Sequence, residues 1–305
     1  MPMSAPSVAV IVVNFNGAEV LRDCLSSLSK STYHSTIIVV DNGSTDNSRS
    51  IVQTEFPNAR LISSKENLGF AAGNNLGIRS ALADNHDYIF VLNNDTLVDR
   101  SCIEHLVKRA EENSRIGAVS PKILFADPPD RIWFAGGSYN LWSGVSRHFG
   151  LRAHADTAKY NIPRLISFAT GCAVLLRSAA LSEVGLFDET LFMYHEDADL
   201  SYRLKAAGWE LVYEPRAIVW HKEAWTTRRT IGRSWGLRLC VRNILAVHQK
   251  HRRWYHAFTF YPSFSWRWLV LPIINALVHN RPDVIKGIVG GVAAYLRNEQ
   301  GKPLK

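Results

Sequence analysis

The first 120 residues of this 305-residue chain alternate between short apolar segments and longer segments with helical spacing. Apolar runs typical of buried strands occupy residues 8–13, 36–40, 60–62 and 88–92. Helical spacing follows each of them, at residues 18–28, 45–56, 71–83 and 101–112. Strands that alternate with helices of this length predict an α/β fold whose central sheet is mostly parallel and is covered by helices on both faces.

A polar cluster follows each of these four apolar segments. In chain order the clusters contain Asn14 and Asn16; Asp41; Asn67, Gly69 and Asn74; and Asn93, Asn94 and Asp95. Parallel strands end at the same edge of a sheet, so we expect these groups to lie together and to form a nucleotide-type pocket. Each cluster alone is also typical of an ordinary turn or helix cap.

The usual phosphate-binding loops are missing from the sequence. There is no GxxxxGK[ST] segment, and no GxGxxG follows the first strand. A diphosphate bound at this edge would therefore need another source of positive charge, which a divalent cation held by Asp95 could supply. Asp41 would then be free to accept hydrogen bonds from a ribose or a base, unless it caps the helix after Gly43.

Three carboxylates stand close together in Glu196-Asp197-Ala198-Asp199, at the start of a helix expected over residues 196–207. Acidic residues are favourable at a helix N-terminus, so a capping role is one explanation. Asp199 has the spacing to pair with Arg203, which leaves Glu196 or Asp197 available for proton transfer. His221 follows a short strand at residues 217–220, where it is either a metal ligand or a polar strand end.

The middle of the chain is less regular. Prolines and glycines between residues 126 and 163 suggest an excursion from the sheet, such as a flap or ribbon. An apolar strand is expected over residues 166–177, running through Thr170 and Gly171. Two short strands are expected at residues 210–213 and 217–220, on either side of Pro215.

The charge of +8 is concentrated at the C-terminal end. Residues 225–305 carry 14 Lys and Arg against two acidic residues, together with 11 aromatic side chains. We therefore divide the chain into a near-neutral globular domain at residues 1–224, which holds the polar clusters, and a basic, helical, aromatic region at residues 225–305. Its apolar segments, 268–278 and 284–296, are too short to span a bilayer and suit helices in a membrane interface. The alternative is a helical pair packed on the body or on a second copy, so a homodimer stays open.

In their order and spacing, the segments from residue 8 to residue 222 resemble the inverting family-2 glycosyltransferases of GT-A fold, and in particular the rhamnosyltransferase-like enzymes of bacterial surface polysaccharides. The resemblance rests on residues 12–17, 41–46, 67–70, 93–95, 170–171, 196–200 and His221. It implies an α/β, Rossmann-like GT-A domain, followed here by the basic helical region.

The resemblance also implies a role for each site residue. Asp41 would contact the nucleoside, and Asp95 would be the last residue of a DxD-type motif that ligates Mg²⁺ or Mn²⁺. Asn93 replaces the first carboxylate of that motif, so the metal would need His221 and phosphate oxygens as further ligands. Asp197 would be the catalytic base, a role that an Asp of ordinary pKa can fill, and Glu196 would face the acceptor. The remaining donor-side residues would be Asn14, Asn16, Asn67, Gly69, Asn74 and Asn94, and the acceptor-side residues Thr170 and Gly171.

The implied reaction moves a sugar from a nucleotide-diphosphate donor, with dTDP-rhamnose as first choice, to a hydroxyl of a lipid-linked or oligosaccharide acceptor. It would serve cell-surface polysaccharide or O-antigen synthesis, in the cytoplasm, with residues 225–305 on the inner face of the plasma membrane. Scattered cysteines and an N-terminus without signal-peptide features agree with that location. One alternative is a nucleotidyltransferase, which would need a cationic first loop. The other is a nucleic-acid-binding protein, favoured by the pI of 9.4 but opposed by the acidic and amide-rich loops of the body.

Overall fold

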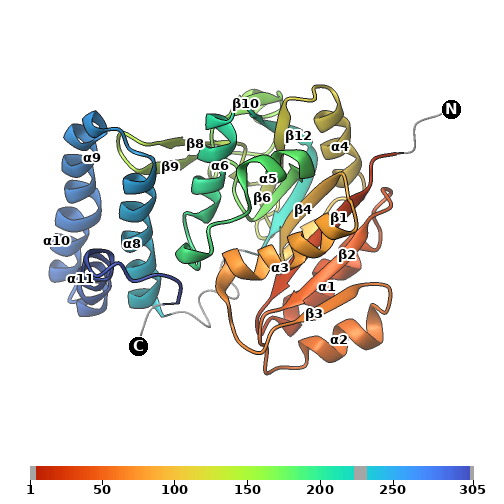
Figure 1. Ribbon diagram of the computed structural model, residues 1–305, viewed down its shortest axis with the longest axis horizontal. Coiled ribbons are helices and arrows are strands. Elements are labelled where there is room, and N and C mark those ends of the chain that lie inside the picture. Colours follow the sequence, from red (N-terminus) through yellow and green to blue (C-terminus); the bar gives the residue numbers. More distant parts are fainter. Residues whose placement is uncertain (1–4, 223–231, 303–305) are drawn as a thin grey trace.

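The computed structural model describes residues 5–222 and 232–302. The expected boundary between residues 224 and 225, and Trp225 itself, lie outside the described residues. Figure 1 shows a sheet with helices on both sides and a separate group of helices formed by the C-terminal part of the chain.

A ten-stranded mixed sheet forms the centre of the fold, with the strand order β10-β12-β6-β11-β4-β1-β2-β3. β5 and β7 pair with β12 and β6 beside this path. The strands are β1 (Val8–Asn14), β2 (Thr36–Asp41), β3 (Arg60–Ser63), β4 (Tyr88–Asn93), β5 (Thr96–Val98), β6 (Ile116–Phe125), β7 (Ile132–Phe134), β10 (Arg164–Ile166), β11 (Ala173–Arg177) and β12 (Glu210–His221). The four strands from β3 to β4 are parallel, and so are β6 and β12. β11 runs antiparallel between β4 and β6. The predicted mostly parallel sheet is confirmed.

Alternation along each strand divides the core into two halves. In β1, Val8, Val10 and Val12 face one core and Ala9 and Ile11 face the other, because successive side chains of a strand point to opposite faces. The first half packs under α1 (Ala18–Leu28), α2 (Ser48–Glu55) and α4 (Cys102–Glu111). The second packs under α3 (Gly69–Ala83), α5 (Ser178–Val184) and α6 (Glu196–Ala206). Helices therefore cover both faces, as the alternating sequence predicted.

Three local expectations were wrong. The strand expected over residues 166–177 is two strands, β10 and β11, because residues 167–172 leave the sheet. The two strands expected around Pro215 are one strand, β12, whose register shifts between Glu214 and Ile218. Proline has no N–H for the ladder, and a bulge accommodates it without ending the strand. The helix expected from residue 45 begins at Ser48, where Asp46 accepts the hydrogen bond of the Ser48 N–H.

The irregular segment after β6 contains the expected ribbon. β8 (Gly137–Asn140) and β9 (Val145–His148) form an antiparallel hairpin, and a 3-10 turn, η1 (Ala158–Tyr160), follows it. In Figure 1 the hairpin reaches from the sheet toward the C-terminal helices. Its tip packs there, since the ring of Trp142 lies 4.6 Å from that of His256 and 5.4 Å from that of Tyr255, centroid to centroid.

The C-terminal helices have a core of their own. They are α8 (Arg233–His251), the short η3 (Trp254–His256), α9 (Ala257–Phe264), the π-helical η4 (Ser265–Val270), α10 (Leu271–Val278) and α11 (Pro282–Leu296). Val241, Ile244, Phe260, Phe264 and Ile288 are buried among them. Within the described ranges, no helix combines the length and the apolar character needed to cross a membrane.

Candidate active site

The polar groups at the ends of β1, β2, β3 and β4 lie together, as predicted, and form one hydrogen-bonded network. The buried Asn14 accepts a hydrogen bond from the Asn94 side chain at 2.7 Å and donates to the Ser44 hydroxyl at 3.3 Å. Asn42 donates to the Asn67 side chain at 3.3 Å and to the Gly69 carbonyl at 2.9 Å. The amides therefore hold the edge of the sheet together, and most of their hydrogen-bonding capacity is used within the protein.

Gly69 and Asn16 also have local structural roles. Gly69 has a φ of +84°, and a Cβ there would lie 2.5 Å from Phe192, so a larger residue would displace that ring. The Asn16 side chain accepts the hydrogen bond of the Thr45 N–H at 2.8 Å. These contacts shape the loops that follow β1 and β3.

Among the buried oxygens at this edge, Asp41 Oδ1 and Asn74 Oδ1 have no hydrogen-bond partner among the described residues. The other carboxylate oxygen of Asp41 accepts from Arg49 Nε at 2.5 Å. Arg49 is a cation that motif reasoning missed, because it lies inside α2 and outside the polar loop. One oxygen of Asp41 thus remains available to a ligand, and a buried acceptor without a partner is unfavourable until a ligand supplies one.

Asp95 and His221 meet because β5 runs antiparallel to the end of β12. Thr96 pairs with His221 in that ladder, and the Lys222 N–H donates to the Asp95 carbonyl at 2.9 Å. As a result, Asp95 Oδ1 and His221 Nε2 face each other at 3.3 Å, and both side chains are buried. Burial lowers the pKa of His221, but Cys172 and Asp95 raise it more, and its net pKa lies well above the ordinary value.

Asp197 is held by backbone amides at the N-terminus of α6. The Gly171 N–H donates to Asp197 Oδ2 at 3.1 Å, and the Ala198 N–H donates to Oδ1 at 2.8 Å. Gly171 belongs to residues 167–172, the segment that leaves the sheet. Burial raises the pKa of Asp197 to about 6, although the amides oppose that shift. The pKa of Asp197 is therefore higher than the ordinary carboxyl value that would already suffice for a base.

Glu196 lies beside Asp197 and differs from it in its contacts. Its Oε2 is buried without a hydrogen-bond partner among the described residues. Burial raises the pKa of Glu196 well above its usual range, and the neighbouring Asp197 raises it further. Two adjacent buried carboxyls do not ionise together easily, so Glu196 keeps its proton while Asp197 is ionised.

The loop of residues 191–195, which leads into α6, has unusual backbone geometry. Phe192, Tyr194 and His195 have φ values of 64°, 72° and 69°. The Met193 N–H donates to the Leu191 carbonyl at 2.7 Å, which closes a γ-turn at Phe192. Non-glycine residues adopt positive φ only where surrounding contacts impose it, and such strain concentrates at functional sites.

Helix α8 supplies those contacts. The side-chain nitrogen of Asn243, which is 0% exposed, lies 2.8, 2.8 and 2.7 Å from the carbonyl oxygens of Leu191, Met193 and Tyr194. Arg242 Nε donates to Asn243 Oδ1 at 2.8 Å, which fixes the orientation of the amide. The C-terminal region thus holds the loop that presents Glu196 and Asp197.

Asp199 provides a second link between α6 and α8. Arg203, Lys250 and His251 lie 2.8, 2.8 and 2.7 Å from its carboxylate oxygens. Burial raises the pKa of Asp199, but its bonds to these three residues lower it more, so the group stays ionised. The predicted pair of Asp199 with Arg203 is confirmed.

One cavity of about 380 Å³ is lined both by the Asp95–His221 pair and by the neighbouring carboxyls of Glu196 and Asp197. Of the predicted site residues, Asn93, Asp95, Thr170, Gly171, Glu196, Asp197 and His221 line it. The predicted donor residues Asn14, Asn16, Asp41, Asn67, Gly69, Asn74 and Asn94 do not line this cavity.

Sequence reasoning missed Phe70, Trp133, His148, Cys172, Met193 and Tyr194, which also line the cavity. The Trp133 ring lies 4.7 Å from the rings of both His148 and His221, centroid to centroid. Burial lowers the pKa of His148. Trp133 and His148 come from the irregular segment after β6, where the sequence shows no regular spacing that would point to them.

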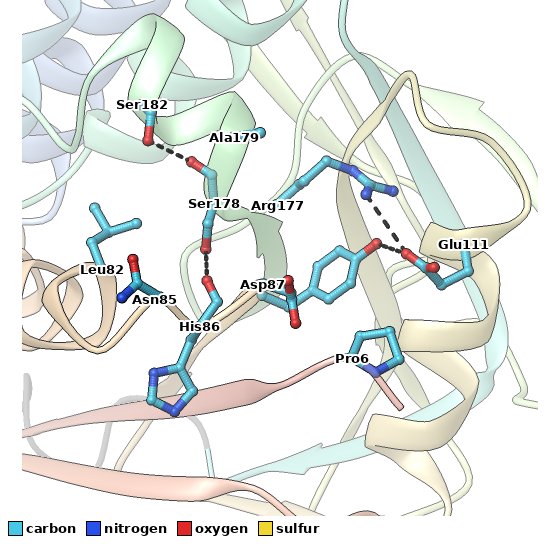
Figure 2. A pocket seen from close by; sticks show the side chains of 11 residues that line it. Pro6, Leu82, Asn85, His86, Asp87, Glu111, Arg177, Ser178, Ala179 and Ser182 are labelled. Atoms are coloured by element: carbon cyan, nitrogen blue, oxygen red, sulfur yellow. Dashed lines mark hydrogen bonds and ion pairs between the residues drawn. The ribbon is translucent and has the colours of Figure 1, made fainter. Parts of the chain in front are cut away.

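A different hollow lies at the opposite edge of the sheet, shown in Figure 2. The Tyr88 hydroxyl donates to Glu111, and Arg177 lies 3.6 Å from the same carboxylate. Asp87 accepts from the Ser7 hydroxyl at 2.8 Å, and Ser178 donates to the His86 carbonyl. These polar groups already have partners, so we assign the hollow a structural role.

With the roles that the family resemblance implies, replacing Asn243 by leucine is expected to lower kcat by at least about tenfold while the dissociation constant of the nucleotide-sugar donor stays the same. The loop would lose its hydrogen-bond donor, and carboxylates displaced by even 1 Å transfer protons poorly. The measurement is kcat, donor affinity and the melting temperature of the full chain. Asn275→Leu, at an exposed position on α10, is the matched control. A lower melting temperature with unchanged kcat would show that Asn243 serves stability alone.

The sheet and the cavity define an α/β enzyme of the GT-A glycosyltransferase type. The chain belongs to glycosyl transferase family 2, whose family model matches residues 9–185. That membership favours a glycosyltransferase over both alternatives, the nucleotidyltransferase and the nucleic-acid-binding protein.

Two relatives show where this chain stands among characterised proteins. It is 31% identical to the N-acetylglucosaminyl-diphospho-decaprenol L-rhamnosyltransferase of Mycobacterium tuberculosis, over 72% of this chain and 77% of the relative. It is 26% identical to the poly-beta-1,6-N-acetyl-D-glucosamine synthase of Staphylococcus epidermidis, over 76% of this chain and 53% of that protein.

Solved structures agree on the fold. GalNAc-T7, crystallised with UDP, GalNAc and Mn²⁺, matches with a TM-score of 0.65 and 17% identity, over 99% of this chain and 59% of that one. The mannosyltransferase PcManGT of Pyrobaculum calidifontis, in complex with GDP-Man and Mn²⁺, matches with a TM-score of 0.60 and 14% identity, over 98% of this chain and 89% of that one.

Proposed function

We propose that this protein is an inverting glycosyltransferase that moves L-rhamnose from dTDP-rhamnose to a hydroxyl of a lipid-linked or oligosaccharide acceptor, in the synthesis of a cell-surface polysaccharide such as O-antigen. The observation that carries the proposal is the single cavity that holds Asp95 and His221 together with Glu196 and Asp197. The similarity to a rhamnosyltransferase that acts on a decaprenol-linked sugar supports the choice of donor and acceptor.

The residues at Asp95 fit a divalent cation. Asp95 Oδ1 is buried, has no hydrogen-bond partner among the described residues, and lies 3.3 Å from His221 Nε2. A carboxylate oxygen and an imidazole nitrogen suit Mn²⁺, and the carboxylate also suits Mg²⁺. His221 would hold the ion in its neutral form, so the cation would replace the imidazole proton that Asp95 stabilises. The described residues contain no group of three His, Cys, Asp or Glu side chains arranged around one ion, so we assign two protein ligands. When bound, the cation would offset the charge of the leaving diphosphate.

The remaining chemistry belongs to the side chains. Asp197 accepts the proton of the acceptor hydroxyl, whose oxygen forms a bond to the anomeric carbon as the bond from that carbon to the diphosphate breaks. Attack from the face opposite the leaving group inverts the anomeric configuration. The Gly171 and Ala198 amides hold the carboxylate in place, and the protonated Glu196 can donate a hydrogen bond to the acceptor. The free oxygen of Asp41 would accept from the nucleoside.

We also propose that the C-terminal helices lie on the inner face of the plasma membrane. Trp254 and Leu277 are 75% and 66% exposed, and Phe258 and Trp266, which lie between them in the sequence, are exposed as well. The basic side chains of Arg253, Arg267 and Arg281 lie on the same helices or their connections. Exposed aromatic and apolar groups with flanking arginines suit an anionic membrane interface.

A donor screen on the full chain tests the function. We expect dTDP-rhamnose with Mn²⁺ or Mg²⁺ to raise the melting temperature more than UDP-, GDP- or other dTDP-sugars do. A ligand present at 100 times its dissociation constant raises the free energy of unfolding by about 2.7 kcal/mol, which raises the melting temperature by several degrees. Incubation with a diphospholipid-linked N-acetylglucosamine should then release dTDP and give a product of inverted configuration by NMR. Transfer from another nucleotide sugar and none from dTDP-rhamnose would overturn the choice of donor.

A further inference from the structure

A second cavity, of about 530 Å³, lies between the β8–β9 hairpin and the C-terminal helices. Most of its wall is apolar, formed by Val145, Leu237, Trp268, Leu271, Pro272 and Ile288. The size is within the range of pockets that bind small molecules. Walls of this kind favour a hydrocarbon ligand, because each apolar group that enters leaves water.

One cation is placed at this cavity. Arg267 lines it, is exposed, and makes no ion pair or side-chain hydrogen bond with a described residue. The two acidic residues of the C-terminal helices are already paired, Asp283 with Arg233 at 3.9 Å and Glu299 with Arg238 at 2.6 Å. The cavity therefore combines apolar walls with an unneutralised positive charge, which complements a ligand that has a hydrocarbon chain and an anionic end.

The cavity adjoins the loop that presents the catalytic carboxylates. His195 lines this cavity, while its neighbours Tyr194 and Glu196 line the catalytic one, so the loop of residues 191–195 ends at a wall shared by both. Burial lowers the pKa of His195 to about 4, and its neutral ring adds no charge to an apolar wall. On the other side the wall continues to the surface, since Leu271 is 51% exposed.

We propose that this second cavity binds the isoprenoid chain of a diphosphate-linked acceptor, with Arg267 against the diphosphate. The inference rests on the proposed function and adds to it the place where the acceptor lipid is recognised. The lipid would enter beside Leu271, and its sugar would extend past the loop of residues 191–195 toward Asp197. A general adsorption of the helices to lipid, or contact with a second copy, would use the exposed surface and not this cavity.

Direct binding to the full-length protein in solution tests the cavity. Farnesyl diphosphate is the probe, titrated by calorimetry, with inorganic diphosphate and farnesol as the two half-ligands. We expect Leu271→Glu to weaken the binding of farnesyl diphosphate at least about tenfold. Arg267→Gln should weaken the binding of farnesyl diphosphate and leave the affinity for farnesol unchanged. Ile274→Glu is the matched control, because Ile274 is on the same helix, is also 51% exposed, and does not line the cavity. If Leu271→Glu and Ile274→Glu lost affinity for farnesyl diphosphate to the same extent, or if neither lost any, the proposal would be overturned.

A chain-length series separates this proposal from the proposed function. The wild type should show a lower KM for acceptors with a long isoprenoid chain than for the same sugar diphosphate on a short alkyl chain. Leu271→Glu should bring the two KM values together, while Ile274→Glu keeps them apart. Sugar transfer with no dependence on chain length would overturn the lipid cavity and leave the enzyme function standing. Farnesyl diphosphate binding without transfer to any acceptor would count against the function alone.

Discussion

Replacing Asp197 by asparagine is expected to lower the rate of sugar transfer by about 10²–10⁴-fold, the range that general-base catalysis contributes. Asparagine has nearly the same shape, and its oxygen can still accept the hydrogen bond from the Gly171 N–H. What it cannot do is take a proton from the acceptor hydroxyl. The loss should therefore appear in kcat, while the dissociation constant of the nucleotide sugar stays close to that of the wild type.

The measurement is single-turnover transfer together with calorimetry of the donor. Asp156→Asn makes the same chemical change at a side chain that is 91% exposed and lies outside the cavity, so it controls for the substitution itself. Wild-type turnover in Asp197→Asn would remove the assignment. Weaker donor binding with unchanged turnover of bound donor would place Asp197 in donor recognition instead.

The pKa of Asp197 also sets the pH profile of the wild type. The base works only when ionised, and burial raises its pKa to about 6. The value of kcat/KM should therefore be half-maximal near pH 6 and level off about one pH unit higher, and well below pH 6 it should fall tenfold per pH unit. A base with an ordinary carboxyl pKa would remain active to about pH 4. The residual activity of Asp197→Asn should lack this step.

The sequence predicted the sheet and its active edge well, because both follow from local patterns. Apolar runs alternate with helices over the first 120 residues, and parallel strands then bring Asn14, Asp41, Asn67 and Asp95 to one edge whatever the details of packing. What local patterns do not reveal is how amides share hydrogen bonds. Asn14 and Asn94 look like ligand-binding groups in the sequence, yet in the structure they bind each other.

The rest of the site depends on contacts between distant segments. His221 reaches Asp95 through the pairing of β5 with β12, which no spacing in either segment encodes. Asn243 lies inside a helix that reads as part of a separate basic region, but its amide contacts the loop before Glu196. Burial raises the pKa of Asp197, and burial is not visible in a motif. Each of these features appears only when the tertiary structure is known.

Replacing Asp95 by asparagine is expected to weaken Mn²⁺-dependent binding of dTDP by about 10–100-fold or more. Changing a residue that only supports a metal ligand already weakens metal binding by about that factor, and Asp95 is assigned as a ligand itself. The chain carries Asn93 where a second carboxylate of a DxD motif would stand, so Asp95 is the only negatively charged ligand we assign. An amide oxygen at the same position is neutral and binds a divalent cation less strongly. The buried environment increases the difference, because charges interact more strongly where water is excluded.

Calorimetry of dTDP with Mn²⁺ and with EDTA separates the metal-dependent part of binding from the rest. In EDTA, the wild type and Asp95→Asn should bind dTDP with the same weak affinity, and only the wild type should gain affinity when Mn²⁺ is added. Asn93→Asp is the opposite variant: it restores a second carboxylate on the same cavity wall, and should strengthen the Mn²⁺-dependent part. Equal gains from Mn²⁺ in wild type and Asp95→Asn would show that the metal is held elsewhere, and His221 would then lose its assigned role with Asp95.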